Sequence, residues 1–359
     1  MTPIKLNPAV EAIPVYPTAS TYEFGGELAK LASNESPFSP HPAVAEAITA
    51  AGHDANRYPD PSGSALRDAL AKTYDVAAEQ IVLGNGSCEI LLAAAQVMLE
   101  PGAEIVYAWP SFSMYPQLAA MTGAKAVEVP LTDDFKHDLP AMAAAVNDKT
   151  RIVLVCNPNN PTSTFVEHAE VAAFIRDLPS EVCVIVDEAY IEFAANAKRD
   201  ELLPLVIDND NVVITRTFAK VFGLAGLRIG YGFSSLRFKQ AVDVVRQPFS
   251  VNLVAQAAAR EALNHPDDVA KRVQSTLIER NWVEGSVRGM GLRTAQTQAN
   301  FSWIDLGERD ENAIVDGLAK QGVIVRAGSA LGATGFIRVS YGERPDNERF
   351  VSSLAGLLD

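Results

Sequence analysis

Lys220 is a charged side chain at a place where the sequence otherwise looks like protein core. It lies in TFAKVFGLAGLR (217–228), soon after VVIT (212–215), an apolar run typical of a buried strand. A buried lysine near other cations loses its proton more easily and becomes a nucleophile. Arg228, in the same stretch, is a permanent cation whose donors match the geometry of phosphate. Alone, Lys220 also fits a surface loop, so its chemistry depends on the other motifs.

The stretch VLGNGSCEILL (82–92) is a candidate phosphate site, because a strand runs through glycines into a helix. Free N–H groups and the dipole at a helix start favour an anion, and glycine lets the backbone approach it. A dinucleotide-binding turn is a rival interpretation. However, Glu89 replaces its third glycine, and Glu104 begins the next strand instead of ending it. A tight turn without a ligand is the structural alternative.

Two further loops follow apolar strands and carry polar side chains. In VCNPNNPTST (155–164), Asn-Pro steps make a rigid loop, and Asn160 can donate to a ligand oxygen. In VIVDEAYIEF (184–193), Asp187 ends an apolar strand, where a buried acid is costly unless a cation faces it. Tyr190 is close enough in sequence to reach the same ligand. The alternatives are a plain turn and a salt-bridged or helix-capping aspartate.

These features share one explanation, which is pyridoxal 5'-phosphate. Lysine forms a Schiff base with that cofactor, and an aspartate keeps its pyridine nitrogen protonated so that the ring accepts electrons. The helix start and Arg228 would bind its phosphate. The sequence therefore predicts a pyridoxal-phosphate site made by several loops.

The elements that must position these loops alternate between strand and helix from about residue 41. Short apolar strands alternating with helices predict an α/β domain with a mostly parallel sheet, whose ligands bind at the carboxyl ends of the strands. One helix, SMYPQLAAMTG (113–123), should be interrupted near its start by Pro116. After residue 252 a long helical stretch, about 253–290, leads into a smaller α+β domain. We therefore expect an N-terminal arm with part of the small domain (1–40), a large cofactor-binding domain (41–252), and a linking helix with the C-terminal small domain (253–359).

Composition narrows the class of protein. The net charge of −14 disfavours nucleic-acid binding. Three cysteines without paired spacing predict neither a disulfide framework nor a zinc site, and the five scattered histidines suggest no metal. We find no signal peptide and no apolar run long enough for a membrane span, so we expect a soluble cytoplasmic protein.

The order of the motifs resembles fold-type I pyridoxal-phosphate aminotransferases, and most closely the histidinol-phosphate aminotransferase family. The resemblance covers nearly the whole chain. It is carried by LASNESPFSP, NRYPDPSG, NPNNPT, DEAYIEF, TFAKVFGLAGLRIGY and IVRAGSALGATGFIRVSYG. It implies the large and small domains of that fold type and a homodimer.

The resemblance also implies a role for each matching residue. Lys220 would form the Schiff base and move a proton, Asp187 would pair with the pyridine nitrogen, and Asn160 and Tyr190 would bond the ring's phenolic oxygen. The remaining cofactor contacts implied by the resemblance are Phe112 stacked on the ring, Gly86, Ser87, Cys88, Thr217 and Arg228 at the phosphate, and Tyr58 reaching the phosphate of the neighbouring subunit.

The substrate residues follow from the same resemblance. Arg338, in GFIRVS, would bind a substrate carboxylate or, in this family, the phosphate of histidinol phosphate. Arg326 would assist it, Asn160 would also face the substrate, and Tyr16, in IPVYP, would close over it. A guanidinium fits carboxylate and phosphate alike, so this clamp does not name the substrate.

Three positions depart from the family pattern. Ala219 stands where a serine or threonine commonly contacts the phosphate, and Thr217 is the residue that would compensate. Ser163 replaces the glycine of NPTG, from which we expect a turn that does not require positive φ. Phe112, where relatives often carry tyrosine, keeps the stacking face without the hydroxyl.

The expected activity is transfer of an amino group between L-histidinol phosphate and 2-oxoglutarate, or in reverse from glutamate to imidazole acetol phosphate, in histidine biosynthesis. The main alternative is an aromatic amino acid aminotransferase acting on phenylalanine or tyrosine. A decarboxylase on the same scaffold and a non-catalytic cofactor-binding protein are more distant alternatives.

Overall fold

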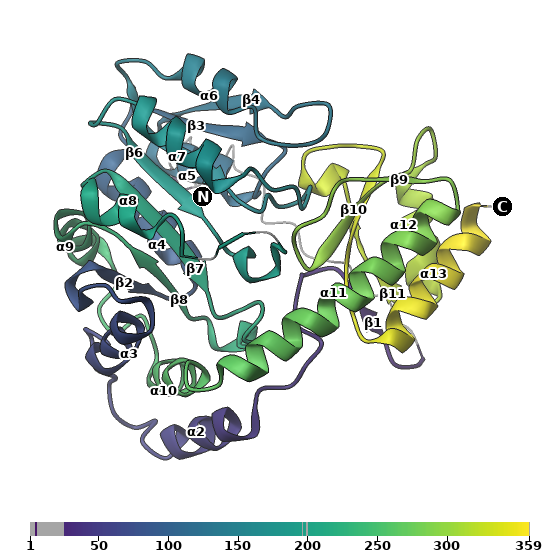
Figure 1. The fold of residues 1–359 in the computed structure, drawn as a ribbon, viewed down its shortest axis with the longest axis horizontal. Coiled ribbons are helices and arrows are strands. Elements are labelled where there is room, and N and C mark those ends of the chain that lie inside the picture. The colour runs from purple at the N-terminus through teal and green to yellow at the C-terminus, as the bar shows by residue number, and fades with distance from the viewer. Residues whose placement is uncertain (1–3, 6–24, 196, 199, 359) are drawn as a thin grey trace.

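The computed structural model describes residues 4–5, 25–195, 197–198 and 200–358 of the 359-residue chain. It consists of a large sheet covered by helices and a smaller sheet with its own helices beside it (Figure 1). The spatial order of the large sheet is β2 (Ile81–Gly84), β8 (Gly230–Phe233), β7 (Val212–Thr217), β6 (Cys183–Asp187), β5 (Thr150–Cys156), β3 (Glu104–Trp109) and β4 (Lys125–Pro130).

Both faces of this sheet are buried by helices. Within β3, for example, Val106 and Ala108 join one hydrophobic core, whereas Ile105 and Tyr107 join the other. Strands buried on both faces must be apolar at nearly every position, as the sequence indicated. The first core is covered by α2 (Pro42–Gly52), α3 (Ser64–Tyr74), α6 (Leu139–Ala145), α7 (His168–Asp177), α8 (Leu203–Asp208) and α10 (Leu253–Ala262), and the second by α4 (Ser87–Met98), α5 (Met114–Thr122) and α9 (Leu236–Val245).

Strand direction confirms the predicted α/β class with a mostly parallel sheet. The strands β7, β6, β5, β3 and β4 pair in parallel, while β8 runs antiparallel to both of its neighbours, β7 and β2. The sequence did not predict β8, which returns from the loop that carries Lys220 and Arg228. Because the parallel strands end at one edge of the sheet, the loops that follow them meet there.

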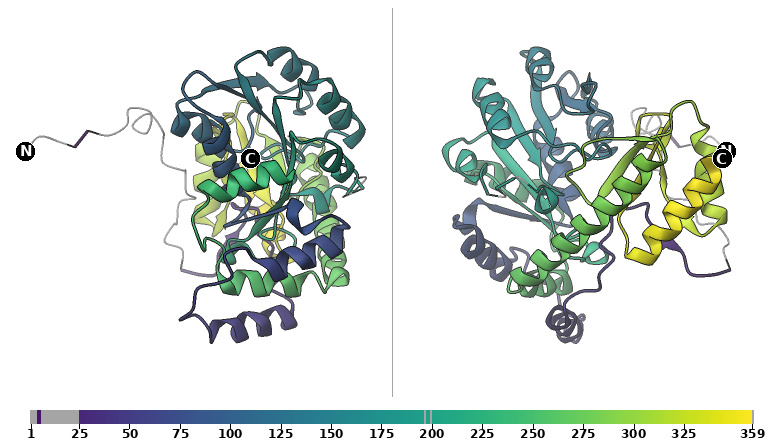
Figure 2. Two further views of the ribbon diagram at one scale, coloured as in Figure 1. Left: turned by 90° about the vertical axis from the view of Figure 1, so that its left-hand side faces the viewer. Right: turned by 45° about the vertical axis from the view of Figure 1, so that its right-hand side comes forward.

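The smaller sheet is antiparallel, in the order β12 (Arg326–Ala327), β13 (Phe336–Ser340), β10 (Phe301–Asp305) and β9 (Arg293–Thr294). A separate parallel pair joins β1 (Ala29–Lys30) to β11 (Val323–Ile324), so the N-terminal segment lies with the small domain. These strands share a core with α12 (Glu311–Lys320), α13 (Arg344–Leu358) and the end of α11 (Pro266–Gly289). The long helix α11 connects the two parts of the molecule (Figure 2).

Two expectations about helices were wrong. The stretch at 253–290 is two helices, because α10 ends at Ala262 and packs against α2 and α3 before α11 begins at Pro266. Pro116 does not interrupt its helix, because it lies in the first turn of α5, where a missing N–H breaks no hydrogen bond. In the described part of the chain, none of the helices has the length and apolar character needed to cross a membrane.

Candidate active site

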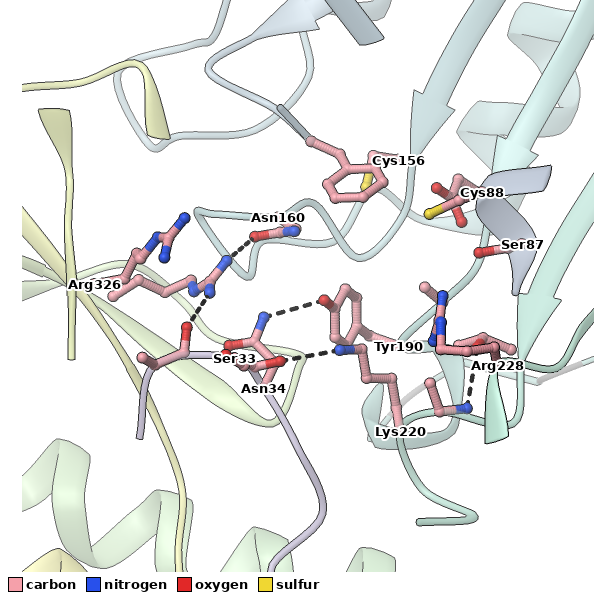
Figure 3. Close-up of a pocket in the computed structure, with 17 residues that line it drawn as sticks. Ser33, Asn34, Ser87, Cys88, Cys156, Asn160, Tyr190, Lys220, Arg228 and Arg326 are labelled. Atoms are coloured by element: carbon pink, nitrogen blue, oxygen red, sulfur yellow. Dashed lines mark hydrogen bonds between the residues drawn. The ribbon is translucent and has the colours of Figure 1, made fainter. Parts of the chain in front are cut away.

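A cavity of about 510 Å³ lies where the carboxyl ends of β5, β6 and β7 face β12 and β13 of the smaller sheet (Figure 3). It is thus walled by both parts of the molecule. The residues that the sequence predicted for the site and that line this cavity are Ser87, Cys88, Phe112, Asn160, Asp187, Tyr190, Thr217, Lys220, Arg228, Arg326 and Arg338.

The amine of Lys220 lies at this cavity. Nζ donates to the carbonyl oxygen of Ser33 at 3.1 Å and lies 5.5 Å from the centre of the Tyr190 ring. Within the described residues, no carboxylate forms a salt bridge with it. Burial, together with the nearby Arg338 guanidinium, lowers the pKa of Lys220 from 10.5 to about 8. An amine with this pKa is partly unprotonated at neutral pH and can act as nucleophile or base.

Asp187 ends β6 and presents a buried carboxylate to the same cavity. The hydroxyl of Tyr115 donates to Oδ2 at 3.0 Å and that of Thr215 donates to Oδ1 at 3.2 Å. Burial raises the pKa of Asp187 from 3.8 to about 6, although both hydroxyls favour the ionised form. In the part of the chain that the structure describes, the carboxylate has no salt-bridge partner, so it suits a ligand that brings its own positive charge.

The start of α4 forms an anion cradle with Arg228. Gly86 is the N-cap residue, with φ of 76°, and a Cβ there would collide with the Arg228 guanidinium. A Cβ on Gly230 would collide with the backbone of Gly86 and Ser87, so glycine is needed at both positions. The free N–H groups of α4 therefore open beside a guanidinium, which is a favourable arrangement for a phosphate.

Phe112 and Thr217 complete the walls near the cradle. The Phe112 ring packs edge-on against Tyr115, with centroids 5.7 Å apart. The Thr217 hydroxyl accepts from the N–H of Ala219 at 3.0 Å and donates to the carbonyl oxygen of Ile229 at 3.4 Å. Thr217 therefore holds the loop of Lys220 in place, and its compensation for Ala219 at a phosphate stays a prediction.

Arg338 on β13 links the smaller sheet to the large domain. Its Nη1 donates to Oδ1 of Asn160 at 2.6 Å and its Nη2 donates to the carbonyl oxygen of Ala32 at 2.6 Å. Arg326 on β12 pairs across the sheet with Arg338, and both guanidinium groups line the cavity. The cavity is thus positively charged at the end opposite the α4 cradle (Figure 3).

The comparisons with known proteins agree with this geometry. The family model for aminotransferase class I and II matches residues 27–354. The chain belongs to this family. Aminotransferases of this class depend on pyridoxal 5'-phosphate, so both the enzyme class and the cofactor expected from the sequence are confirmed.

Relatives of this aminotransferase carry two different activity names. An aromatic amino acid aminotransferase of Thermobifida fusca is 42% identical over 98% of this chain and 96% of its own length. A histidinol-phosphate aminotransferase of Moorella thermoacetica is 40% identical over 92% of this chain and 86% of its own. The structure of a histidinol-phosphate aminotransferase from Sinorhizobium meliloti, in complex with pyridoxal 5'-phosphate, superimposes with a TM-score of 0.90, at 29% identity and covering 99% and 97% of the two chains.

Two predicted site residues are not in the cavity. Tyr58 is 82% exposed and stacks on Phe249, with ring centroids 4.6 Å apart. An exposed aromatic pair is compatible with a contact to a second subunit, which stays a prediction. Tyr16 lies outside the described residues.

The expectation about Ser163 was wrong. Its φ is 60°, in the left-handed region, so the turn keeps the conformation that glycine usually provides. The N–H of Ser163 donates to the carbonyl oxygen of Asn159 at 2.7 Å, and its own carbonyl accepts from Gln298 N–H at 2.7 Å. These bonds stabilise the strained residue and keep Asn160 beside the cavity.

Several functional contacts were not predicted from the sequence. The segment 32–34 lines the cavity, and Asn34 donates from Nδ2 to the Tyr190 hydroxyl at 3.0 Å. Tyr115 contacts Asp187. The only signal for Asn34 was its place in LASNESPFSP, and nothing in the sequence connected Tyr115 to Asp187.

Proposed function

We propose that this aminotransferase transfers an amino group between L-histidinol phosphate and 2-oxoglutarate, in histidine biosynthesis. The observation that carries the proposal is the pair of guanidinium groups, Arg326 and Arg338, in one cavity with the amine of Lys220. A phosphate dianion suits two guanidinium groups better than one carboxylate does. The likeness in structure to the Sinorhizobium meliloti enzyme supports the same substrate.

An aromatic amino acid aminotransferase is the second candidate, because the relative from Thermobifida fusca carries that name at 42% identity. A flat phenyl ring can occupy a space that accepts imidazole, and Arg338 suits a carboxylate. The two candidates share the cofactor and differ only in what the clamp holds.

The described residues fit pyridoxal 5'-phosphate. Asp187 is a buried carboxylate without a salt bridge within the described chain, as a protonated ring nitrogen requires, and Gly86 with Arg228 leaves room for a phosphate. Lys220 would hold the cofactor covalently, Phe112 would cover its ring, and Ser87 and Cys88 would bind its phosphate through the backbone. When bound, the cofactor withdraws electrons from the substrate's α-carbon and makes the proton there acidic.

The chain's own residues then act on that proton. Lys220 Nζ, whose pKa is about 8, takes the proton from the α-carbon and returns one to the product side. Asp187 stays ionised above its pKa of about 6 and holds the ring nitrogen's proton in place. Asn160 and Tyr190 bond the ring's phenolic oxygen, while Arg338 and Arg326 hold the substrate's anionic group. We further propose a cytoplasmic homodimer in which Tyr58 reaches the neighbouring subunit's phosphate, with Tyr16 closing over the substrate.

A half-reaction tests the substrate. The cofactor's visible absorbance would be followed while L-histidinol phosphate and L-phenylalanine are added in separate titrations. Bleaching at a far lower concentration of L-histidinol phosphate is the expected result. Equal or better bleaching by L-phenylalanine would replace the proposal with the aromatic enzyme, and a protein that never acquires the absorbance would contradict both.

A further inference from the structure

Three consecutive residues, 32–34, each contact a different functional side chain (Figure 3). Two of these contacts use backbone carbonyl oxygens, which any residue would supply. The third uses the side chain of Asn34, whose Nδ2 donates to the Tyr190 hydroxyl at 3.0 Å. Asn34 is therefore the member of the segment whose residue type carries information.

The orientation of the Asn34 amide is fixed by Ser340. The backbone N–H of Asn34 donates to Ser340 Oγ at 2.8 Å, and Ser340 Oγ donates in turn to Asn34 Oδ1 at 3.0 Å. A hydroxyl has only one proton, so Ser340 can complete both bonds only when Oδ1 faces it. The amide nitrogen of Asn34 must then face Tyr190.

Asn34 is also held rigidly. It is completely buried, its φ of 55° is in the left-handed region that asparagine tolerates, and its carbonyl oxygen accepts from Asn300 Nδ2 at 3.1 Å. Ser340 and Asn300 both belong to the small domain's side of the cavity, whereas Tyr190 follows β6 of the large sheet. The amide is thus a fixed donor that crosses from one part of the molecule to the other.

This donor decides where the Tyr190 hydroxyl can send its own proton. Because the hydroxyl oxygen accepts from Asn34, its proton is not used in that bond and must point elsewhere. No acceptor for it lies within hydrogen-bonding distance among the residues that the structure describes, and the side chain lines the cavity. Burial raises the pKa of Tyr190 to about 13, so the proton is present throughout the physiological range.

We infer that Asn34 is a positioning residue, which sets the direction of the Tyr190 hydroxyl so that its proton points into the cofactor cavity, toward an oxygen acceptor on the ligand. The inference rests on the proposed role of Tyr190 toward the cofactor's phenolic oxygen. Asn34 makes that hydroxyl a donor to the ligand, whereas an acceptor at position 34 would draw the proton away.

The test reverses the bond with Asn34→Asp. The carboxylate accepts from both Ser340 and Tyr190, so it turns the Tyr190 proton away from the cavity, while aspartate tolerates the same backbone conformation. The dissociation constant of pyridoxal 5'-phosphate is measured on the cofactor-free protein, and the midpoint of the pH-dependent visible absorbance on the loaded protein. We expect affinity to fall about tenfold and the midpoint to rise, because a donor to a charged oxygen is lost.

A double-mutant cycle with Tyr190→Phe separates this effect from the added charge. Any effect of Asn34→Asp that persists without the hydroxyl is due to charge alone, so the loss of affinity should be about tenfold smaller in the Tyr190→Phe protein. Ser340→Ala is the uncharged second variant, which frees the amide to rotate and gives a smaller effect of the same kind. Thermal melting of each cofactor-free variant shows whether it is folded.

The outcomes are distinct. If Tyr190→Phe changes affinity and absorbance but Asn34→Asp has the same effect in both backgrounds, Asn34 acts through structure or charge and the inference is wrong. If Tyr190→Phe changes neither, the proposed role of Tyr190 fails and the inference fails with it. Because no substrate is used, neither result depends on whether the enzyme prefers L-histidinol phosphate or L-phenylalanine.

Discussion

Asp187 and Glu188 are neighbours in the chain and both are buried, yet their surroundings are opposite. Asp187 faces the cavity and is held only by hydroxyl groups, from Tyr115 and Thr215. Glu188 faces the other side of the sheet, where Arg216 binds its Oε2 through Nη2 at 2.7 Å and through Nε at 2.8 Å. One carboxylate is neutralised by the fold and the other waits for a ligand.

This difference follows from the alternation of side chains along a strand, which places adjacent residues on opposite faces. The face with Glu188 holds a closed cluster of charges, which also includes His168 and Asp200 near Arg216 and Glu188. The face with Asp187 holds charges that the described residues do not pair with one another, including Lys220. Charged groups left without an opposite charge inside a cavity therefore mark the site, whereas matched charges mark structure.

The largest expected effect is on the cavity side. Lys220→Ala should lower turnover by about 10⁴-fold or more, because both the covalent anchor and the base are lost. Thermal melting should show that the fold survives, since the amine forms no salt bridge within the described residues. Lys239→Ala, which removes a surface ion pair with Asp243, is the matched control and should keep full activity. Turnover above about 1% of the parent in Lys220→Ala would break the comparison.

Glu188→Gln should have the largest effect on stability. It leaves the Arg216 guanidinium buried with one carboxylate fewer, at a cost of about 3 kcal/mol in the free energy of unfolding. The affinity of the folded protein for pyridoxal 5'-phosphate should hardly change. Denaturant unfolding measures the first quantity, and Glu279→Gln, at a half-exposed pair with Arg344, should cost no more than about 1 kcal/mol. Equal costs at both positions would contradict the structural role of Glu188.

Asp187→Asn should do the reverse and stabilise the cofactor-free protein at neutral pH. The folded pKa of Asp187 lies above its unfolded value of 3.8, at about 6, so ionisation costs stability above about pH 6 and nothing below about pH 4. Removing the charge should raise the free energy of unfolding by about 3 kcal/mol at pH 7, and the gain should vanish in acid. Activity should fall by at least about 10²-fold. A destabilised variant at pH 7 would show that Asp187 has a structural partner.

Arg338→Lys sharpens the comparison with the smallest effect. Lysine keeps the charge but loses the two-pronged geometry that bonds Asn160 and Ala32. We expect kcat/KM for the better substrate to fall about 10- to 100-fold, while the dissociation constant of pyridoxal 5'-phosphate stays within about twofold. Steady-state kinetics and a cofactor titration measure the two. A loss confined to cofactor binding would place Arg338 outside the substrate clamp.

Much of the large domain could be predicted, because its signals are local. Apolar strands such as β5 and β6 are each followed by a loop with polar residues, and the rule for carboxyl ends then brings those loops together. The strand β8 was not predicted because GYGF is short and contains two glycines, which weaken any strand pattern.

The contacts of the segment 32–34 could not be predicted, because they depend on pairing between distant parts of the chain. Asn34 and Ser340 are separated by 306 positions, and neither stands in a periodic pattern that indicates the other. Ser163 was misjudged for a related reason, since its positive φ is maintained by hydrogen bonds to Asn159 and Gln298 rather than by its own preference. Local sequence therefore predicted the cofactor end of the cavity better than the end built by the small domain.

The most direct test of the account is to find which lysine holds the cofactor. The loaded protein would be treated with borohydride, which fixes pyridoxal 5'-phosphate to its lysine, and the labelled peptide would be identified by mass spectrometry. The account predicts a single label on Lys220, in the peptide that contains TFAKVFGLAGLR. A label on another lysine, or labels spread over surface lysines, would contradict the site described here.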